Sequence, residues 1–261
     1  MPRTRDTSER RQQISAMVRQ RGSVQVAPLA RQFGVSMQTI RKDLLFLGQL
    51  GITERSYGGA ILASAVNVTS EPALDAKRAV HTDEKARIGA LAAAMVASGD
   101  SIVLDSGTTA LQIARHLPDD EEITVVTNDF DILAALTQKN RLNVVMLGGA
   151  LRRKNMAFYG AQTMRALDDL HVDKLFLGVD GFDVERGITT HYEPEAMLNR
   201  KMVEAARQVI VVTDGSKFGQ VCLHRIINLD GVDDLVTDGD TLPEGIRAAA
   251  DRFGFRIHCP N

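Results

Sequence analysis

Short apolar runs alternate with helical stretches from Thr82 onward, and this alternation limits the possible folds more than any other feature of the sequence. Each run is three to five residues long, as expected for strands buried on both faces. Strand–helix alternation of this kind predicts an α/β fold: a mostly parallel sheet with helices on both faces. The expected strands are 101–104, 123–126, 144–147, 175–179, 209–212 and 235–237.

The first sixty residues follow a different pattern. Apolar residues at helical spacing predict helices over 8–20 and 27–33, and a third helix capped by Ser36. Gly34 permits the tight turn between the last two helices. The alternating segment 52–60 predicts a two-stranded wing. We therefore expect three parts, listed as a winged helix-turn-helix domain at 1–60, a linker at 61–80 and an α/β domain at 81–261.

Charge is distributed unevenly between these parts. Residues 1–60 hold ten Lys and Arg against four Asp and Glu, for a net charge of +6, whereas the remainder carries −8. We call residues 1–60 the head and the rest of the chain the body. A basic head next to an acidic body favours a head that binds a polyanion such as DNA. Charge alone is equally compatible with a solvated basic face that has no partner.

The predicted third helix carries the candidate base-reading residues. Gln38, Thr39, Arg41 and Lys42 fall on its outward face, near the N-terminal half that enters the major groove in helix-turn-helix proteins. Arg41 suits guanine, Gln38 suits adenine, and Lys42 suits a phosphate. Ser36 offers a hydroxyl and a backbone N–H at the helix N-terminus, which is a natural phosphate site.

The wing supplies further DNA-binding candidates, Arg55, Tyr57 and Gly58. Glycines at 58 and 59 would let the chain approach the duplex backbone closely. An alternative remains open for Tyr57, which can equally pack on the domain itself.

The candidate ligand site of the body lies where predicted strands end. Asp105, Ser106, Gly107, Thr108 and Thr109 follow the first strand, where backbone N–H groups and hydroxyls can surround an anion. Open α/β sheets bind ligands at this edge. The remaining candidates also follow strands and are Thr127, Asn128, Gly148, Gly149, Asp180 and Lys217.

Several of these assignments have plain structural alternatives. Asp180 and Asp214 can hydrogen-bond sugar hydroxyls or simply cap turns, and Lys217 can be a solvated loop lysine. His191 and Glu193 can contact a ligand or lie on the surface. The histidines show no metal-ligand spacing, so we expect no metal and no cofactor.

Nothing in the sequence indicates secretion or a membrane. No apolar run approaches the ~20 residues that span a bilayer. The charged N-terminus lacks a hydrophobic stretch, and the two cysteines, Cys222 and Cys259, do not predict a disulfide framework. We expect a cytoplasmic protein.

Several motifs, in order along nearly the whole chain, resemble the DeoR family of bacterial transcription regulators. They are Leu29–Ser36, Thr39–Leu44, Tyr57–Ala60, Asp105–Thr109, Thr127–Asn128, Leu147–Gly149 and Ser216–Gly219. Segments 22–26, 158–160 and 183–187 are most similar to the subgroup that represses the N-acetylgalactosamine pathway (the aga operon). The chain departs from the family pattern at Gly215, where serine is commoner, and at Lys42, where arginine is commoner.

The resemblance implies a body of the Rossmann-like ribose-5-phosphate isomerase type, used as a sensor of phosphorylated sugars. It further implies a repressor of a carbohydrate operon, with an amino-sugar operon as the narrower expectation. Effector binding would favour a body arrangement in which paired heads no longer fit the operator. Because two-fold operators need paired heads, we expect a homodimer or homotetramer.

Two other classes of function remain in view. A sugar-phosphate isomerase with an appended DNA-binding domain needs a carboxylate base and an electrophile, for which Glu193 or Glu195 with Lys217 are the candidates. This hypothesis leaves the basic head unexplained, so we expect no enzymatic activity. A winged-helix module for protein interaction would show no salt-dependent binding to duplex DNA.

Overall fold

The computed structural model describes residues 7–21, 23–50, 52–56, 58–62, 71–239 and 242–260. These residues form two compact units that divide between Val80 and His81. No helix within the described ranges has both the length and the apolar character that a membrane crossing requires.

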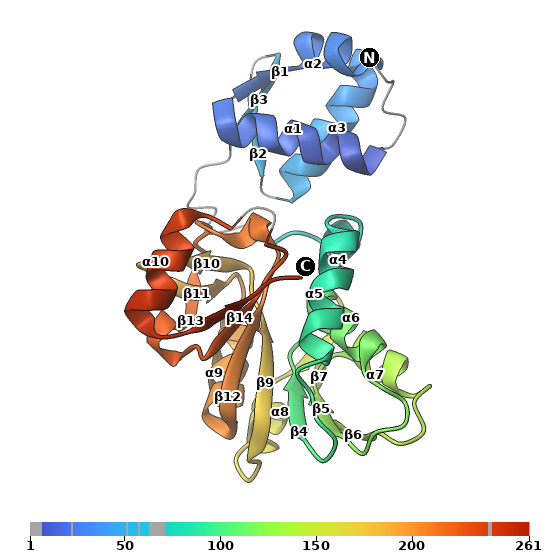
Figure 1. The fold of residues 1–261 in the computed structure, drawn as a ribbon. Helices are drawn as coiled ribbons and strands as arrows, with labels where there is room; N and C mark the ends of the chain where they lie inside the picture. The colour runs from blue at the N-terminus through green and yellow to red at the C-terminus, as the bar shows by residue number, and fades with distance from the viewer. Residues whose placement is uncertain are drawn as a thin grey trace. The chain divides into compact units, whose positions relative to one another are not determined.

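The first unit encloses its core between helices and a small antiparallel sheet (Figure 1). The core side chains come from positions at helical spacing, such as Ile14 and Val18 in the first helix and Ile40, Leu44 and Leu47 in the third. The elements are α1 (Thr7–Arg21), β1 (Ser23–Gln25), α2 (Val26–Phe33), α3 (Met37–Gln49), β2 (Thr53–Ser56), β3 (Gly59–Leu62) and α4 (Leu74–Arg78).

The sheet of this unit has three strands, in the order β1-β3-β2, and not the two predicted for the wing. β1 pairs with β3 across Val24 and Ala60, both buried. The sequence analysis did not predict β1, because a strand of three residues contains only one inward side chain and shows no alternation.

The second unit is built on seven strands in the order β15-β14-β12-β9-β4-β5-β6, and every neighbouring pair is parallel. The predicted α/β class is therefore confirmed. The strands are β4 (Ser101–Leu104), β5 (Thr124–Thr127), β6 (Asn143–Met146), β9 (Val172–Gly178), β12 (Ala206–Val212), β14 (Asp234–Val236) and β15 (Arg256–His258).

Alternate side chains of these strands enter two separate cores. Phe176 of β9 packs with Ile102 and Leu104 of β4 on one face, and Leu175 packs with Val103 on the other. The first face is covered by α5 (Thr82–Ala93), α6 (Thr108–His116) and α7 (Phe130–Leu136) (Figure 1). The second is covered by α8 (Ala161–Arg165), α9 (Glu193–Ala205) and α10 (Glu244–Phe253). Burial on both faces explains why the central strands are continuous apolar runs. β6 and β15, at the two edges of the sheet, have no buried residue, so the expected burial on both faces is wrong for β6.

Several short elements lie outside the main sheet, and the sequence analysis did not predict them. They are the hairpin β7 (Ala150–Arg152) and β8 (Ala157–Tyr159), the small sheet of β10 (Gly181–Asp183), β11 (Gly187–Thr190) and β13 (His224–Ile227), and the 3₁₀ turns η1 (Gly215–Lys217) and η2 (Leu229–Gly231). β7–β8 and β10–β11 are local hairpins whose strands of three or four residues are too short to show alternation, whereas β13 pairs with β11 across a long stretch of sequence.

Chain order reverses between two central strands. From β4 the chain proceeds outward to β5 and β6, then returns to place β9 on the other side of β4 and continues through β12, β14 and β15. In open α/β sheets, ligands bind at a reversal of this kind, beyond the carboxyl ends of the two strands, here β4 and β9.

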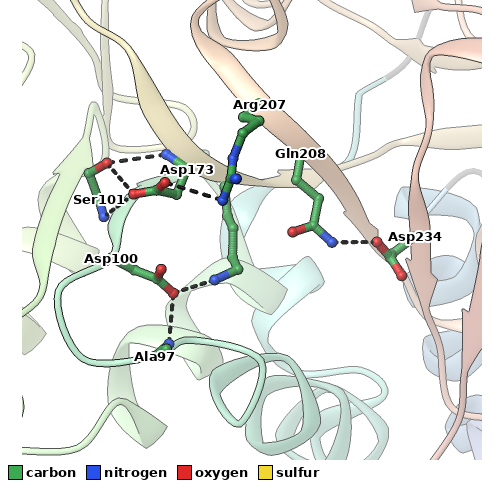
Figure 2. Close-up of polar contacts among 8 residues, drawn as sticks. Ala97, Asp100, Ser101, Asp173, Arg207, Gln208 and Asp234 are labelled. Carbon is green, nitrogen blue, oxygen red and sulfur yellow. Dashed lines mark hydrogen bonds and ion pairs between the residues drawn. The ribbon is translucent and has the colours of Figure 1, made fainter.

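The amino-terminal edge of the sheet is held by charged hydrogen bonds between neighbouring strands (Figure 2). Asp173 accepts from the backbone N–H and hydroxyl of Ser101 at 2.9 and 2.8 Å. Asp234, fully buried, accepts from Gln208 Nε2 at 2.7 Å, Arg256 Nη2 at 2.9 Å and His258 Nε2 at 2.7 Å. Burial alone would raise the pKa of Asp234, but these three donors outweigh it and lower the pKa.

We expect Asp234→Asn to lower the free energy of unfolding by about 1–3 kcal/mol at pH 7, because three donors lose their shared carboxylate. The pKa of Asp234 is lowered in the folded state, so this contribution is present above the carboxyl's unfolded pKa and disappears as the pH falls through the folded value. Urea unfolding from pH 7 to pH 3 would test this. Exposed Asp230→Asn is the control, and an equal loss for both variants would contradict the account.

Candidate functional site

The turn between α2 and α3 adopts the geometry that its sequence predicts. Gly34 ends α2 in the left-handed conformation (φ 63°), and the N–H of Val35 donates to the carbonyl of Ala30 at 3.1 Å. The Ser36 hydroxyl then caps α3 by accepting from the N–H of Thr39 at 3.1 Å. The predicted cap is confirmed, and it fixes the point at which α3 begins.

α3 has one exposed polar face and one buried face. Ser36, Gln38, Arg41 and Lys42 are exposed, and Thr39 is half-buried. The opposite face buries Ile40, Asp43, Leu44 and Leu47. Four of the five candidates on this helix therefore lie where a duplex could reach them.

The wing is described only in part. Gly58 is exposed and has a positive φ of 73°, and a Cβ at Gly59 would overlap the backbone of Val24. Arg55 lies within β2. Tyr57 falls outside the described residues.

In the second unit, the turn after β4 and the turn after β5 meet. The N–H of Gly107 donates to Asp129 Oδ2 at 3.1 Å, while Asp129 Oδ1 caps α7 by accepting from the N–H groups of Asp131 and Ile132. Gly107, with φ 132°, begins α6, and half-buried Thr108 and Thr109 are its first residues. Asp129 was missed as a candidate, although its cap position after a strand is a recognisable signal.

Four predicted residues serve mainly to hold these turns. The Thr127 hydroxyl accepts from the N–H of Asp129, and Asn128 Nδ2 donates to the carbonyl of Phe158 at 3.0 Å. The carbonyl of Gly148 accepts from Thr163 Oγ1 at 2.6 Å. Gly149 has φ 134°, and a Cβ there would come within 2.7 Å of the carbonyl oxygen of Tyr159.

A polar cluster lies at the carboxyl ends of β4 and β9. Asp105 Oδ2 accepts from Asn199 Nδ2 of α9 at 3.3 Å. The Tyr159 hydroxyl lies 3.3 Å from Ser106 Oγ, accepts from Asn155 Nδ2 at 2.6 Å and donates to Glu195 Oε2 at 3.3 Å. We call Asp105, Asn155, Tyr159, Glu195 and Asn199 the acceptor cluster.

Asp180 connects to the same cluster through Thr190. The Thr190 hydroxyl lies 2.8 Å from Glu195 Oε1 and 3.2 Å from Asp180 Oδ2, so it can donate to either carboxylate. Among the predicted residues, Asp105, Ser106 and Asp180 are thus brought together.

Negative charge is concentrated in the acceptor cluster. Burial, followed by the charges of Glu195 and Asp129, raises the pKa of Asp105, against the opposing effect of the Ser106 and Gly178 N–H groups. Burial and then Glu195 likewise raise the pKa of Tyr159. The pKa of Asp129 is raised to about 6, chiefly by burial.

Three buried oxygens of the cluster have no hydrogen-bond partner of normal geometry among the described residues: Oδ1 of Asp105, of Asn155 and of Asn199. Buried acceptors left in this state are costly unless a ligand or water supplies donors. The cluster can therefore receive several hydroxyl or amine hydrogens from a bound molecule.

A second cluster, of cations, lies beyond the carboxyl end of β12. Asp214 is buried, and burial raises its pKa, but the charges of Lys217, His81 and Lys85 and a hydrogen bond with the Ser216 side chain lower it to about 2. We call Lys85 and Lys217 the cation cluster. The Asp214 carboxylate also caps η1, so the capping alternative for this residue is confirmed.

Lys85 was not predicted. It is a buried lysine on α5, one turn before Gly89, where a Cβ would overlap Gln112 of α6. α5 leads into β4 at the amino edge of the sheet, so its start lies towards the carboxyl edge, where α6 also starts. The two helices therefore run in the same direction, and Lys85 lies at the level of Thr108, one turn before Gln112.

Within the described ranges, no group of three or more His, Cys, Asp or Glu side chains is arranged to hold a metal ion. His191 Nε2 lies 3.5 Å from Cys222 Sγ. Glu193 is exposed at the start of α9.

At pH values where Asp105 is ionised, we expect Asp105→Asn to stabilise the protein by on the order of 1 kcal/mol, because the amide removes a buried charge from the neighbourhood of Glu195 and Asp129. The pKa of Asp105 is raised in the folded state, so the wild type recovers this stability as the pH falls through that value. Thermal unfolding at several pH values, with exposed Asp251→Asn as control, would measure the difference. A variant less stable than wild type at every pH would show that the carboxylate stabilises the fold.

The comparisons with known proteins agree with the two-unit organisation. Residues 10–66 match the DeoR-like helix-turn-helix domain, and residues 80–239 match the DeoR C terminal sensor domain. Ribose 5-phosphate isomerase A of Methanocaldococcus jannaschii aligns with 52% of this chain and 54% of its own, at 19% identity and a TM-score of 0.40.

Curated relatives match over nearly their full length. A protein of Escherichia coli O157:H7 with the provisional name aga operon transcriptional repressor is 43% identical over 95% of this chain and 93% of its own. The glycerol-3-phosphate regulon repressor of Escherichia coli K12 is 32% identical over 88% and 90%. Transcriptional repressor AccR of Agrobacterium fabrum is 33% identical over 92% and 95%. With both domain models matched in order, the chain belongs to the DeoR family of helix-turn-helix transcriptional regulators.

Proposed function

We propose that this protein represses a carbohydrate catabolic operon and leaves its operator when the second unit binds a phosphorylated sugar. The observation that carries the proposal is the pairing of two chemically opposite clusters at one edge of one sheet. The cation cluster suits a phosphate, and the acceptor cluster suits the hydroxyl hydrogens of a sugar.

The spacing of the two clusters supports a single ligand. Asp105 follows β4 and Asp214 follows β12, and only β9 separates those strands. Two strand spacings amount to about 10 Å, which a phosphorylated six-carbon sugar can span. The phosphate would meet Lys85, Lys217 and the first N–H groups of α6, where the helix dipole also favours an anion.

The same geometry argues for a sensor and against an isomerase. Glu195, the candidate base, hydrogen-bonds to Tyr159 and Thr190. Lys217, the candidate electrophile, instead lowers the pKa of Asp214 through its charge. The two groups belong to different clusters. We propose that the protein binds its ligand without converting it, in keeping with relatives that are named as transcriptional regulators.

Release of DNA requires that the effector bind two states of the protein with different affinity. We propose that the effector-bound form is the one whose heads no longer fit a two-fold operator, which implies at least a homodimer. The narrower proposal, an amino-sugar operon, rests on the resemblance to the N-acetylgalactosamine-pathway subgroup and on the aga operon relative.

For the head, we expect Arg41→Ala to weaken operator binding by about 1–3 kcal/mol, because Arg41 is exposed on the face of α3 that would meet base edges. Fluorescence anisotropy with an operator duplex and a random duplex would separate base reading from phosphate contact. An equal loss on both duplexes would assign Arg41 to the DNA backbone.

For the second unit, we expect Lys217→Ala to weaken binding of hexose 6-phosphates about tenfold to hundredfold, as for loss of one charge-assisted hydrogen bond. Operator affinity without sugar should not change. Calorimetry with the phosphorylated and free hexose would measure the effect, and Arg247→Ala, which removes an exposed cation of α10, is the control. If all three proteins bound no phosphorylated sugar, the proposed effector class would be wrong.

A further inference from the structure

The recognition helix α3 is attached to α1 by an ion cluster at Asp43. Arg10 Nε donates to Asp43 Oδ2 at 2.7 Å, and Arg11 Nε donates to Asp43 Oδ1 at 2.8 Å. The side chains of Arg10 and Asp43 are only 5% and 2% exposed, and that of Arg11 is 24% exposed. Each carboxylate oxygen thus has its own guanidinium, from consecutive residues of one helix.

A second contact fixes Arg11. Its guanidinium lies over the ring of Phe46, 3.8 Å from the centroid. Phe46 lies three residues after Asp43, about one turn along the same face of α3. Arg11 therefore contacts α3 at two adjacent turns, once through charge and once through an aromatic face.

The angular position of Asp43 decides what this contact does. Residues two apart on an α-helix point about 200° from each other, so Asp43 and Arg41 project to opposite sides. When Asp43 is pulled onto α1, Arg41 is turned outward, in accord with its exposure. α3 is also anchored at its start by the Ser36 cap and near its middle by the Thr53 hydroxyl, which donates to the carbonyl of Leu44 at 3.2 Å.

Rotation of α3 matters more to base reading than to general attraction for DNA. A turn of about 20° would shift the outer surface of a helix, roughly 5–6 Å from its axis, by about 2 Å. A bidentate hydrogen bond to a base does not survive such a shift, whereas long-range attraction between basic residues and phosphates is nearly indifferent to it.

We propose that Arg10 and Arg11 are positioning residues for operator recognition. Their hydrogen bonds to Asp43 set the rotation of α3 and thereby the DNA sequence preference of the head. A buried ion pair contributes little net stability compared with apolar packing. The cluster can orient α3 in a way that apolar side chains cannot, because the two guanidiniums define a direction for the Asp43 carboxylate.

Two variants of the full-length protein test the proposal without removing the buried Arg10. Arg11→Gln deletes one charge and leaves Arg10 on Asp43, and Phe46→Leu removes the stacking surface with no change of charge. Arg31→Gln, which deletes an exposed charge of α2, is the matched control. An operator duplex is first selected from a random-sequence library with the wild-type protein.

Anisotropy titrations on the selected duplex and on a random duplex, over a range of salt concentrations, provide the readout. We expect both variants to lose about tenfold in affinity for the selected duplex. Affinity for the random duplex and the slope of affinity against salt should stay at wild-type values. Repeating the selection with Phe46→Leu should give a less defined sequence preference.

Two results would overturn the proposal. Weaker binding to both duplexes with a salt slope reduced by about one would make Arg11 a phosphate contact. A lower melting temperature with an unchanged ratio of operator to random affinity would make the cluster a stabilising contact only. Because Phe46→Leu retains every charge, it decides the question even if Arg11→Gln does not fold.

Discussion

The reversal of chain direction between β4 and β9 is the constraint on which the proposed sensor depends. In open α/β sheets, ligands bind beyond the carboxyl ends of the strands at such a reversal. Asp105 follows β4 and Gly178 ends β9 at that point, and a Cβ at Gly178 would approach the carbonyl of Ser106 to 3.3 Å. The side chains gathered there come from the segments that follow these strands and from α9, which supplies Asn199 and Glu195.

At the carboxyl edge of the sheet, two buried aspartates differ in pKa because of their neighbouring charged residues, more than because of burial. Asp105 and Asp214 are both almost fully buried, and burial raises the pKa of each. Glu195 and Asp129 raise the pKa of Asp105 further, whereas Lys217, His81 and Lys85 bring that of Asp214 to about 2. The neighbours of Asp105 thus favour negative charge, whereas the neighbours of Asp214 favour positive charge, on the same edge of the sheet. This separation matches a ligand with an anionic end and a hydroxylated end.

The sequence was informative where local chemistry decides structure. The Gly34 turn, the Ser36 cap and the six predicted strands depend on neighbouring residues or on short periodic patterns. The structure confirms them, although β6 is an edge strand with no buried residue. Lys85, Asn199 and Tyr159 could not be found in this way. Asn199 meets Asp105 across 94 positions of sequence, and Tyr159 meets Ser106 across 53. A buried lysine in a helix of ordinary composition gives no local signal, because only the fold brings Asp214 into its neighbourhood.

The central claim is that one molecule reads DNA with the first unit and is released through the second. The most direct measurement is the occupancy of a labelled operator duplex at fixed protein concentration during titration with a hexose 6-phosphate that calorimetry shows to bind. The account predicts that occupancy falls over the same concentrations that saturate the protein, and that the unphosphorylated hexose leaves occupancy unchanged. Full occupancy at saturating sugar phosphate would contradict the account.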